Sequence, residues 1–186
     1  MKPILLSLVL LLSCPGMNAQ DQTSAKESRK EASQRKKAEK EAKIDSLYRL
    51  TGKLLETRRI VLEATTLSGR MGRPVHVSSI LNFVAIDSDN VVLQVGSVQA
   101  IGYNGVGGIT AQGRANGWRI SPSDKQKMYD LFLTANTNKG VYDIHISIDY
   151  SGYATATLTG YSAGQINFTG NLVPVKNSGV YKGQSY

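Results

Sequence analysis

The sequence predicts a mainly β protein, a single antiparallel β sandwich or barrel of about eight strands preceded by an N-terminal helix. Three changes along the 186 residues support this prediction. The first segment, 1–19, is apolar with a single charge, Lys2. Residues 20–59 carry 12 Lys or Arg and 7 Asp or Glu, and from Ile60 onward Gly, Thr, Ser, Tyr and β-branched residues dominate. Lys, Glu, Gln and Ala favour helices, whereas β-branched and aromatic residues favour strands.

Residues 1–19 have the organisation of a secretory signal peptide. Lys2 precedes an apolar segment, and Pro15 and Gly16 then break the helix before the small residue Ala19. The apolar segment is much shorter than the roughly 20 residues that a membrane span needs. We therefore expect cleavage after Ala19 and localisation in the periplasm.

Cys14 leaves a second mode of processing open. The sequence Leu11-Leu12-Ser13-Cys14 resembles a bacterial lipobox, in which the cysteine is acylated and becomes the new N-terminus. The protein would then be an outer-membrane-anchored lipoprotein. Cys14 is the sole cysteine, so the mature chain has no disulfide in either case, and a compact core has to supply its stability.

Residues 20–57 are predicted to form a charged helical stalk. Between residues 23 and 57 there is no proline, and Gly52 is the single glycine. The last part, 44–55, is amphipathic and is expected to dock on the β domain, because its apolar residues recur at helical spacing. These residues are Ile44, Leu47, Tyr48, Leu54 and Leu55. The apolar repeat lasts under two heptads, which is too short for a coiled coil.

The net charge of +8 is concentrated in this stalk, because the part from Ile60 carries 9 bases against 7 acids. Acidic residues are interleaved with the basic ones along the stalk sequence, which is typical of a solvated helix rather than of a nucleic-acid-binding stripe. No nucleic-acid partner is expected. Membrane contact is expected only through a lipid on Cys14 or through the basic stalk.

Residues 58–175 are predicted to form the antiparallel β domain. Apolar and polar residues alternate most clearly in 141–150, which predicts a strand with one buried and one wet face. The apolar face holds Tyr142, Ile144, Ile146, Ile148 and Tyr150, and the wet face holds Asp143, His145, Ser147 and Asp149. Turn residues at 151–152 and 87–90 predict two hairpins, and further strands are expected at 60–66 and 165–172.

Two segments of the β domain are ambiguous. Residues 109–120 are expected as a strand pair interrupted by glycine or as one bent strand. Ser121-Pro122-Ser123-Asp124 could cap a helix, but the alternation that follows favours a strand over 128–135. No helical pattern separates successive strands, so parallel crossovers are not expected, and the choice between barrel and sandwich stays open. Residues 176–186 are expected to be a flexible tail.

Glycine-spaced strand sequences carry a resemblance to a known family. They include Gly102-Tyr103-Asn104-Gly105-Val106-Gly107-Gly108, Gly140-Val141-Tyr142-Asp143-Ile144 and Gln165-Ile166-Asn167-Phe168-Thr169-Gly170, after Arg58-Arg59-Ile60-Val61-Leu62. Over roughly residues 58–175 the chain resembles the domain of unknown function 4251 family, exported proteins of Bacteroidetes. The resemblance implies an envelope β domain without an assigned activity, and it supplies no catalytic residues.

No motif in the chain predicts catalysis, a cofactor or a metal. The glycine-rich run 102–108 lacks the Gly-Lys-Ser/Thr ending of a phosphate loop and is explained by a turn. Of the two histidines, His76 stands alone, whereas His145 shares a strand face with Asp143 and Asp149, where a weak metal or acid–base site is the alternative to a wet face. Trp118 and the tyrosines favour cross-strand packing over sugar stacking.

These observations favour a non-enzymatic module that binds a small ligand or has a structural role in the periplasm. A barrel could hold a small apolar ligand in its interior or mouth. The alternative is an envelope interaction protein whose basic stalk contacts anionic lipid or cell wall. A monomer or weak oligomer is expected.

Overall fold

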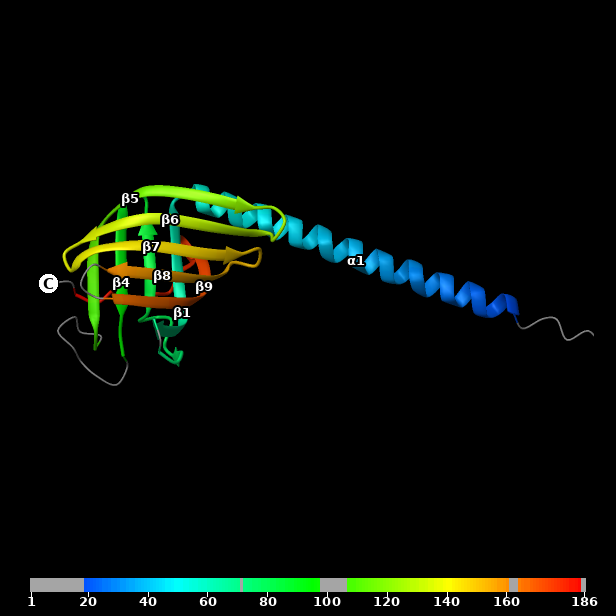
Figure 1. The fold of residues 1–186 in the computed structure, drawn as a ribbon, viewed down its shortest axis with the longest axis horizontal. Coiled ribbons are helices and arrows are strands. Elements are labelled where there is room, and N and C mark those ends of the chain that lie inside the picture. The colour runs from blue at the N-terminus through cyan, green and yellow to red at the C-terminus, as the bar shows by residue number, and fades with distance from the viewer. Residues whose placement is uncertain (1–18, 71, 98–106, 161–163, 185–186) are drawn as a thin grey trace, which may run out of the picture. The chain divides into compact units, whose positions relative to one another are not determined.

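The computed structural model describes residues 19–70, 72–97, 107–160 and 164–184, with side chains from Arg29 onward (Figure 1). The predicted signal segment lies outside the described residues apart from Ala19, so the cleavage and Cys14 predictions stay open. The chain divides into two compact units, Met1–Glu41 and Ala42–Tyr186. The predicted N-terminal helix is confirmed as α1 (Ala19–Glu56). Within the described ranges, no helix has both the length and the apolarity to cross a membrane.

The second unit is a closed antiparallel β barrel, so the choice left open by the sequence is settled as a barrel. Eight strands form it in the order β1-β3-β4-β5-β6-β7-β8-β9, and β9 pairs again with β1. Figure 1 shows β6, β7 and β8 crossing β1 and β4 at a steep angle. The barrel strands are β1 (Arg59–Gly69), β3 (Phe83–Asp87), β4 (Asn90–Val95), β5 (Ile109–Ser123), β6 (Met128–Thr137), β7 (Gly140–Asp149), β8 (Tyr153–Gly160) and β9 (Gly164–Pro174). A ninth, two-residue strand, β2 (Val75–His76), pairs with the end of β1, and a short 3₁₀ helix, η1 (Val175–Asn177), follows β9.

The two ambiguous segments are both strands. β5 is one bent strand, because its pairing with β6 shifts register between Asn116 and Arg119. Gly117 lies in this bulge with φ +69°, a left-handed conformation that glycine adopts at little cost. The strand prediction for 128–135 is confirmed by β6, whose ten residues all pair with β7.

The interior of the barrel is filled with apolar side chains. The alternation predicted for 141–150 is confirmed within β7, where Ile144, Ile146 and Ile148 are buried in the core. Tyr150 lies beyond the end of the strand, in the turn to β8. The other strands contribute Leu, Ile, Val, Ala and Phe side chains to the same cluster. An eight-stranded barrel is just wide enough for side chains to fill it, so burial of these residues drives folding.

The last turns of α1 pack against one end of the barrel. Leu55 is fully buried in the barrel core, and Tyr48 stacks on Tyr129 of β6 with ring centroids 4.4 Å apart. The Tyr48 hydroxyl donates to Asp124 (3.0 Å), and burial raises the pKa of that phenol well above its usual value. Gly52 faces the Tyr129 hydroxyl so closely that a Cβ there would collide with it. The helix therefore contributes directly to the core at this end.

The segment after β9 was expected to be a flexible tail, and its described part, up to residue 184, is instead hydrogen-bonded to the barrel. Tyr181 donates its amide to the carbonyl of Ile80 (2.9 Å), and Gly183 is buried and donates to the side chain of Gln94 (2.7 Å). Gln94 is fully buried, and its amide nitrogen donates to the carbonyl of Tyr181 (2.8 Å). The prediction was wrong for this part because buried backbone and amide groups need partners, and the terminal segment supplies them.

Candidate functional site

The outer face of β5–β8 carries a groove of about 410 Å³. Strand alternation points one set of side chains into the core and the other set outward, and the outward set of four neighbouring strands lines this groove. No side chain rises from Gly117 in the bulge of β5, which leaves that end of the groove open. The lining residues are Gly117, Arg119, Phe132, Leu133, Thr134, Asp143, Ile144, His145, Thr157 and Thr159.

A row of paired residues crosses the floor of the groove. Register places Arg119 opposite Phe132, Phe132 opposite His145, and His145 opposite Thr157. The guanidinium carbon of Arg119 lies 4.8 Å from the centroid of the Phe132 ring. The imidazole of His145 stacks on the same ring at 4.5 Å with an interplanar angle of 2°. These contacts favour an orientation in which the arginine and the histidine both lie against the Phe132 ring.

The histidine is also held by a carboxylate from the neighbouring strand. Nε2 of His145 lies 2.8 Å from Oδ1 of Asp130, and the hydroxyl of Ser147 donates to the same oxygen (2.5 Å). The pKa of Asp130 lies below its usual value, mainly because Ser147 donates to the carboxylate. The hydrogen bond with His145 adds to this lowering, while partial burial opposes it.

Ser147 and His145 do not form a nucleophile–base pair. Ser147 donates its proton to Asp130 and not to the imidazole, so the carboxylate lies between the hydroxyl and the histidine. A Ser–His pair needs the imidazole to accept the serine proton directly. The geometry therefore favours a structural role for Asp130 in orienting His145.

The opposite wall of the groove is polar. Asp143 accepts a hydrogen bond from the hydroxyl of Thr134 (2.9 Å), and Thr157 and Thr159 lie on the adjoining strand β8. Arg119 and Asp143 are both exposed. A guanidinium, a carboxylate, an imidazole and several hydroxyls therefore line the same groove.

The structure separates the polar residues that the sequence placed on one strand face. Asp143 lines the groove together with His145, but Asp149 caps the β7–β8 turn, where it accepts from the amides of Ser151 (2.7 Å) and Tyr153 (3.0 Å). His76 is exposed on β2. No group of three His, Cys, Asp or Glu side chains that could hold a metal ion is present among the described residues. Most of the glycine-rich run 102–108 lies outside them.

Sequence reasoning missed Arg119, Asp130 and Phe132 at this site, and it placed Ser147 on the wet face beside His145 without assigning it a role. The two-residue turn at Asn138-Lys139 could have predicted which residues of β6 and β7 lie opposite each other. A two-residue turn pairs Thr137 with Gly140, and counting outward from that pair places Phe132 opposite His145 and Asp130 opposite Ser147. Arg119 could not be found in this way, because the bulge in β5 changes the register on that side.

A second, mainly apolar hollow of about 370 Å³ lies where α1, β1 and β9 meet at the end of the barrel. Leu54, Thr57 and Arg59 form one side of it, and Pro174, Val175 and Lys176 form the other. Next to Leu54, the fully buried Leu55 fills the barrel end. This end of the barrel is therefore closed by the helix.

The fold and the groove define a small closed β-barrel domain with a polar outer surface site. The family model described as "Domain of unknown function (DUF4251)" matches residues 35–172, and the chain belongs to this family. The resemblance is thereby confirmed. The match begins within α1, earlier than residue 58, which agrees with the packing of the helix end into the barrel core.

The chain is also similar to a solved structure, a DUF4251 family protein from Bacteroides eggerthii DSM 20697. The two sequences are 26% identical, the likeness covers 76% of this chain and 96% of that chain, and the TM-score is 0.60. No curated protein matches the chain. The comparisons thus establish the family and the barrel fold.

Proposed function

We propose that this protein is an exported, non-enzymatic binding module that takes a small acidic sugar in the groove on the outer face of β5–β8. The observation that carries this proposal is the stacked row of Arg119, Phe132 and His145 along a groove that also presents Asp143. Side chains held in place before binding lose little conformational freedom when a ligand arrives.

The chemistry of the groove favours a ligand with one anionic group and several hydroxyls. A guanidinium binds a carboxylate through two parallel hydrogen bonds, and stacking on Phe132 orients the fork of Arg119. Asp143, Thr157 and Thr159 supply acceptors and donors for hydroxyl groups. A volume of about 410 Å³ lies within the usual range for small-molecule sites.

The filled interior argues against the small apolar ligand expected from the sequence. Side chains from all eight strands occupy the space inside the barrel, and Leu55 fills one end. The hollow beside Leu54 and Val175 is an apolar candidate at the end of the barrel. Its lining residues do not include a stacked row of side chains, like Arg119, Phe132 and His145, that would orient a ligand.

The proposal of a non-enzymatic role is supported by the hydrogen-bond pattern around His145. Its Nε2 is engaged with Asp130, and the nearby hydroxyl of Ser147 is bonded to the same carboxylate. Ser147 therefore makes no direct hydrogen bond to His145, as a Ser–His pair for acyl transfer would require, and the pattern favours a histidine that is oriented for binding.

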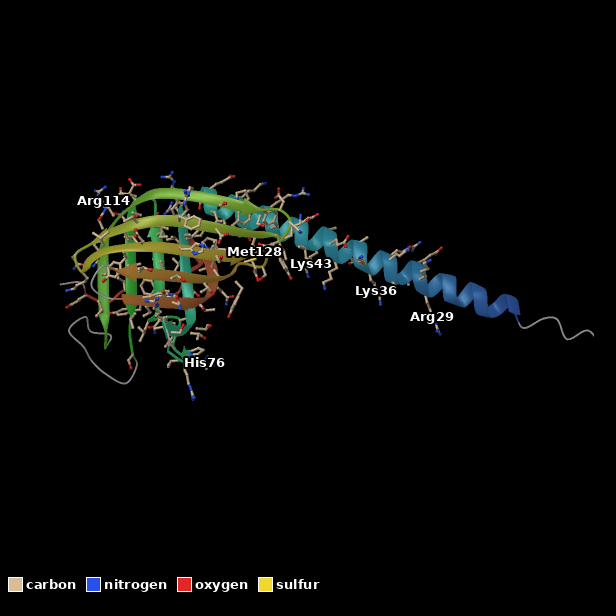
Figure 2. The ribbon with its side chains drawn as sticks, viewed as in Figure 1. Arg29, Lys36, Lys43, His76, Arg114 and Met128 are labelled. Carbon is tan, nitrogen blue, oxygen red and sulfur yellow. The ribbon has the colours of Figure 1, made fainter. Side chains whose placement is uncertain are left out.

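Isothermal titration calorimetry with glucuronate and glucose tests the ligand class. Glucuronate is expected to bind the wild-type protein more tightly than glucose. Arg119→Ala should weaken glucuronate binding about tenfold, as expected for loss of a charge-assisted hydrogen bond, and leave glucose binding nearly unchanged. Arg114→Ala is the matched control, because Arg114 is an exposed arginine on the same strand but outside the groove (Figure 2).

Equal losses in both arginine variants would show that net charge, and not the groove, attracts the sugar acid. An apolar ligand that co-purifies with the protein would instead favour the hollow beside Leu54. Turnover of a substrate that Asp130→Asn abolishes would contradict the non-enzymatic role.

Export is proposed on the pattern of residues 1–19. Cell fractionation of the full chain, followed by intact mass measurement, tests it and distinguishes the two modes of processing. A periplasmic product beginning at Gln20 supports cleavage after Ala19, an acylated product beginning at Cys14 supports the lipoprotein alternative, and an unprocessed cytoplasmic product would overturn export.

A further inference from the structure

The basic residues of the first unit are concentrated on one face of α1. Bases and acids are interleaved along residues 29–41, but a helix advances about 100° per residue, which sorts them onto different faces. Arg29, Lys36 and Lys40 fall within about 40° of one another, and Lys30 and Lys37 extend this sector to about 120°. Figure 2 shows Arg29 and Lys36 projecting from the same side of α1.

Apart from the bases, this sector of the helix contains only Ser33. Glu31 and Glu39 lie on the other side together with Arg35, and Glu41 lies at the border. From Arg29 to Lys40 the basic face extends about 16 Å along the helix axis. All its side chains are exposed, and none of them takes part in an ion pair with another described residue.

The basic face is unfavourable for an isolated helix. Lys36 and Lys40 are like charges four residues apart, a spacing at which they repel each other. An anionic partner on this face would relieve the repulsion between Lys36 and Lys40.

The composition of the face indicates what kind of anionic partner fits. It has no aromatic side chain on which a nucleic-acid base could stack and no large apolar residue that could insert between acyl chains. We propose that the basic face of α1 lies on an anionic phospholipid surface and is held there by charge alone. This proposal is independent of the sugar-binding groove, which belongs to the second unit.

Co-sedimentation of the full chain with vesicles tests the proposal. At low salt, the protein should bind phosphatidylglycerol-containing vesicles more tightly than neutral phosphatidylcholine vesicles, and 0.5 M salt should remove the difference. Any binding of residues 4–12 to acyl chains would be equal for both kinds of vesicle. The amount of protein bound to the neutral vesicles is therefore the baseline.

A pair of adjacent charge reversals distinguishes the face from net charge. Lys36→Glu should weaken the binding to anionic vesicles about tenfold, since each base near such a surface contributes to binding. Arg35→Glu is the matched control: it changes the net charge by the same amount on the opposite side of the helix and should weaken binding less than about threefold.

Equal losses in the two variants would overturn the assignment to this face. So would binding that does not distinguish anionic from neutral vesicles. Tighter binding to a double-stranded DNA fragment than to anionic vesicles, at the same salt concentration, would overturn the choice of partner.

Discussion

The two outer faces of the barrel differ in how far their outward side chains are buried. On β1, β3 and β4 part of the outward side is covered: Val61, Phe83 and Gln94 are buried although they point away from the barrel axis, and Gln94 bonds to the C-terminal segment. On β5–β8 the outward side chains that line the groove remain partly or fully exposed, among them Arg119, Phe132 and His145. The same strand geometry thus produces a second core on one face and an open groove on the other.

The difference in coverage between the two outer faces indicates which face of the barrel is available to a ligand. Covered outward residues stabilise the protein through burial and through saturated hydrogen bonds, whereas uncovered ones contribute little to stability and remain available to a ligand. Substitutions that contrast the two faces therefore test the whole interpretation. They are given below in order of decreasing effect on the free energy of unfolding.

The largest contrast is expected between two phenylalanines. Phe83→Ala should lower the free energy of unfolding by about 3–5 kcal/mol, because Phe83 is only 1% exposed and its removal leaves a cavity. Phe132→Ala should lower it by about 1 kcal/mol, because that ring loses only contacts with Arg119 and His145 at the surface. Urea unfolding of both variants measures the difference. Similar losses would show that the two faces are equally covered.

The hydrogen bonds of the covered face are tested at Gln94. Its amide donates to the carbonyls of Leu81 and Tyr181, and its oxygen accepts from Thr110 and Gly183. Gln94→Leu should lower the free energy of unfolding by about 2 kcal/mol, because these buried partners lose their bonds.

Hydrogen exchange sharpens this test, since the amide of Gly183 should lose its protection in Gln94→Leu. Gln112→Leu is the control: Gln112 accepts only from the exposed Lys182 among the side chains, and its loss should cost about 0.5 kcal/mol or less. Unchanged protection of Gly183 in Gln94→Leu would mean that Gln94 does not anchor the terminal segment.

The smallest effect is expected at Asp130 on the open face. Its pKa is lowered by folding, so its contribution to stability is present above the unfolded value of about 4 and is lost as the pH falls through the folded value. The side chain is 37% exposed, so solvent screening limits the contribution to below about 1 kcal/mol.

Asp130→Asn should therefore be slightly less stable than the wild type at pH 7, and the difference should disappear near pH 2. Unfolding by urea at both pH values measures this. Asp143→Asn serves as the control, because Asp143 lines the same groove and accepts a hydrogen bond from Thr134. A difference for Asp130→Asn that grows on acidification would contradict the assigned direction of the pKa shift.

Much of the fold follows from local patterns. The alternation in 141–150 predicted the faces of β7, because successive side chains of a strand point to opposite sides. The helical spacing of Tyr48 and Leu55 likewise predicted which side of α1 is buried. These signals lie within one element and need no knowledge of its neighbours.

The terminal segment and the groove were not predictable in this way. Residues 176–184 have no hydrophobic period, and their order depends on Gln94 and Ile80, far away in the sequence. The groove depends on the register of four strands and on a bulge at Gly117 that shifts one of them. A local pattern cannot specify a pairing that is fixed by distant partners.

The sequence by itself determined a helix followed by antiparallel strands, because side-chain periodicity and helix propensity act within a few residues. Only the tertiary structure decided that β9 closes on β1, that the C-terminal segment bonds to Gln94 on one outer face, and that Arg119, Phe132 and His145 meet on the other. Those outcomes depend on contacts between residues far apart in the chain, where the loss of chain entropy is balanced by burial and by hydrogen bonds that form once the barrel is closed.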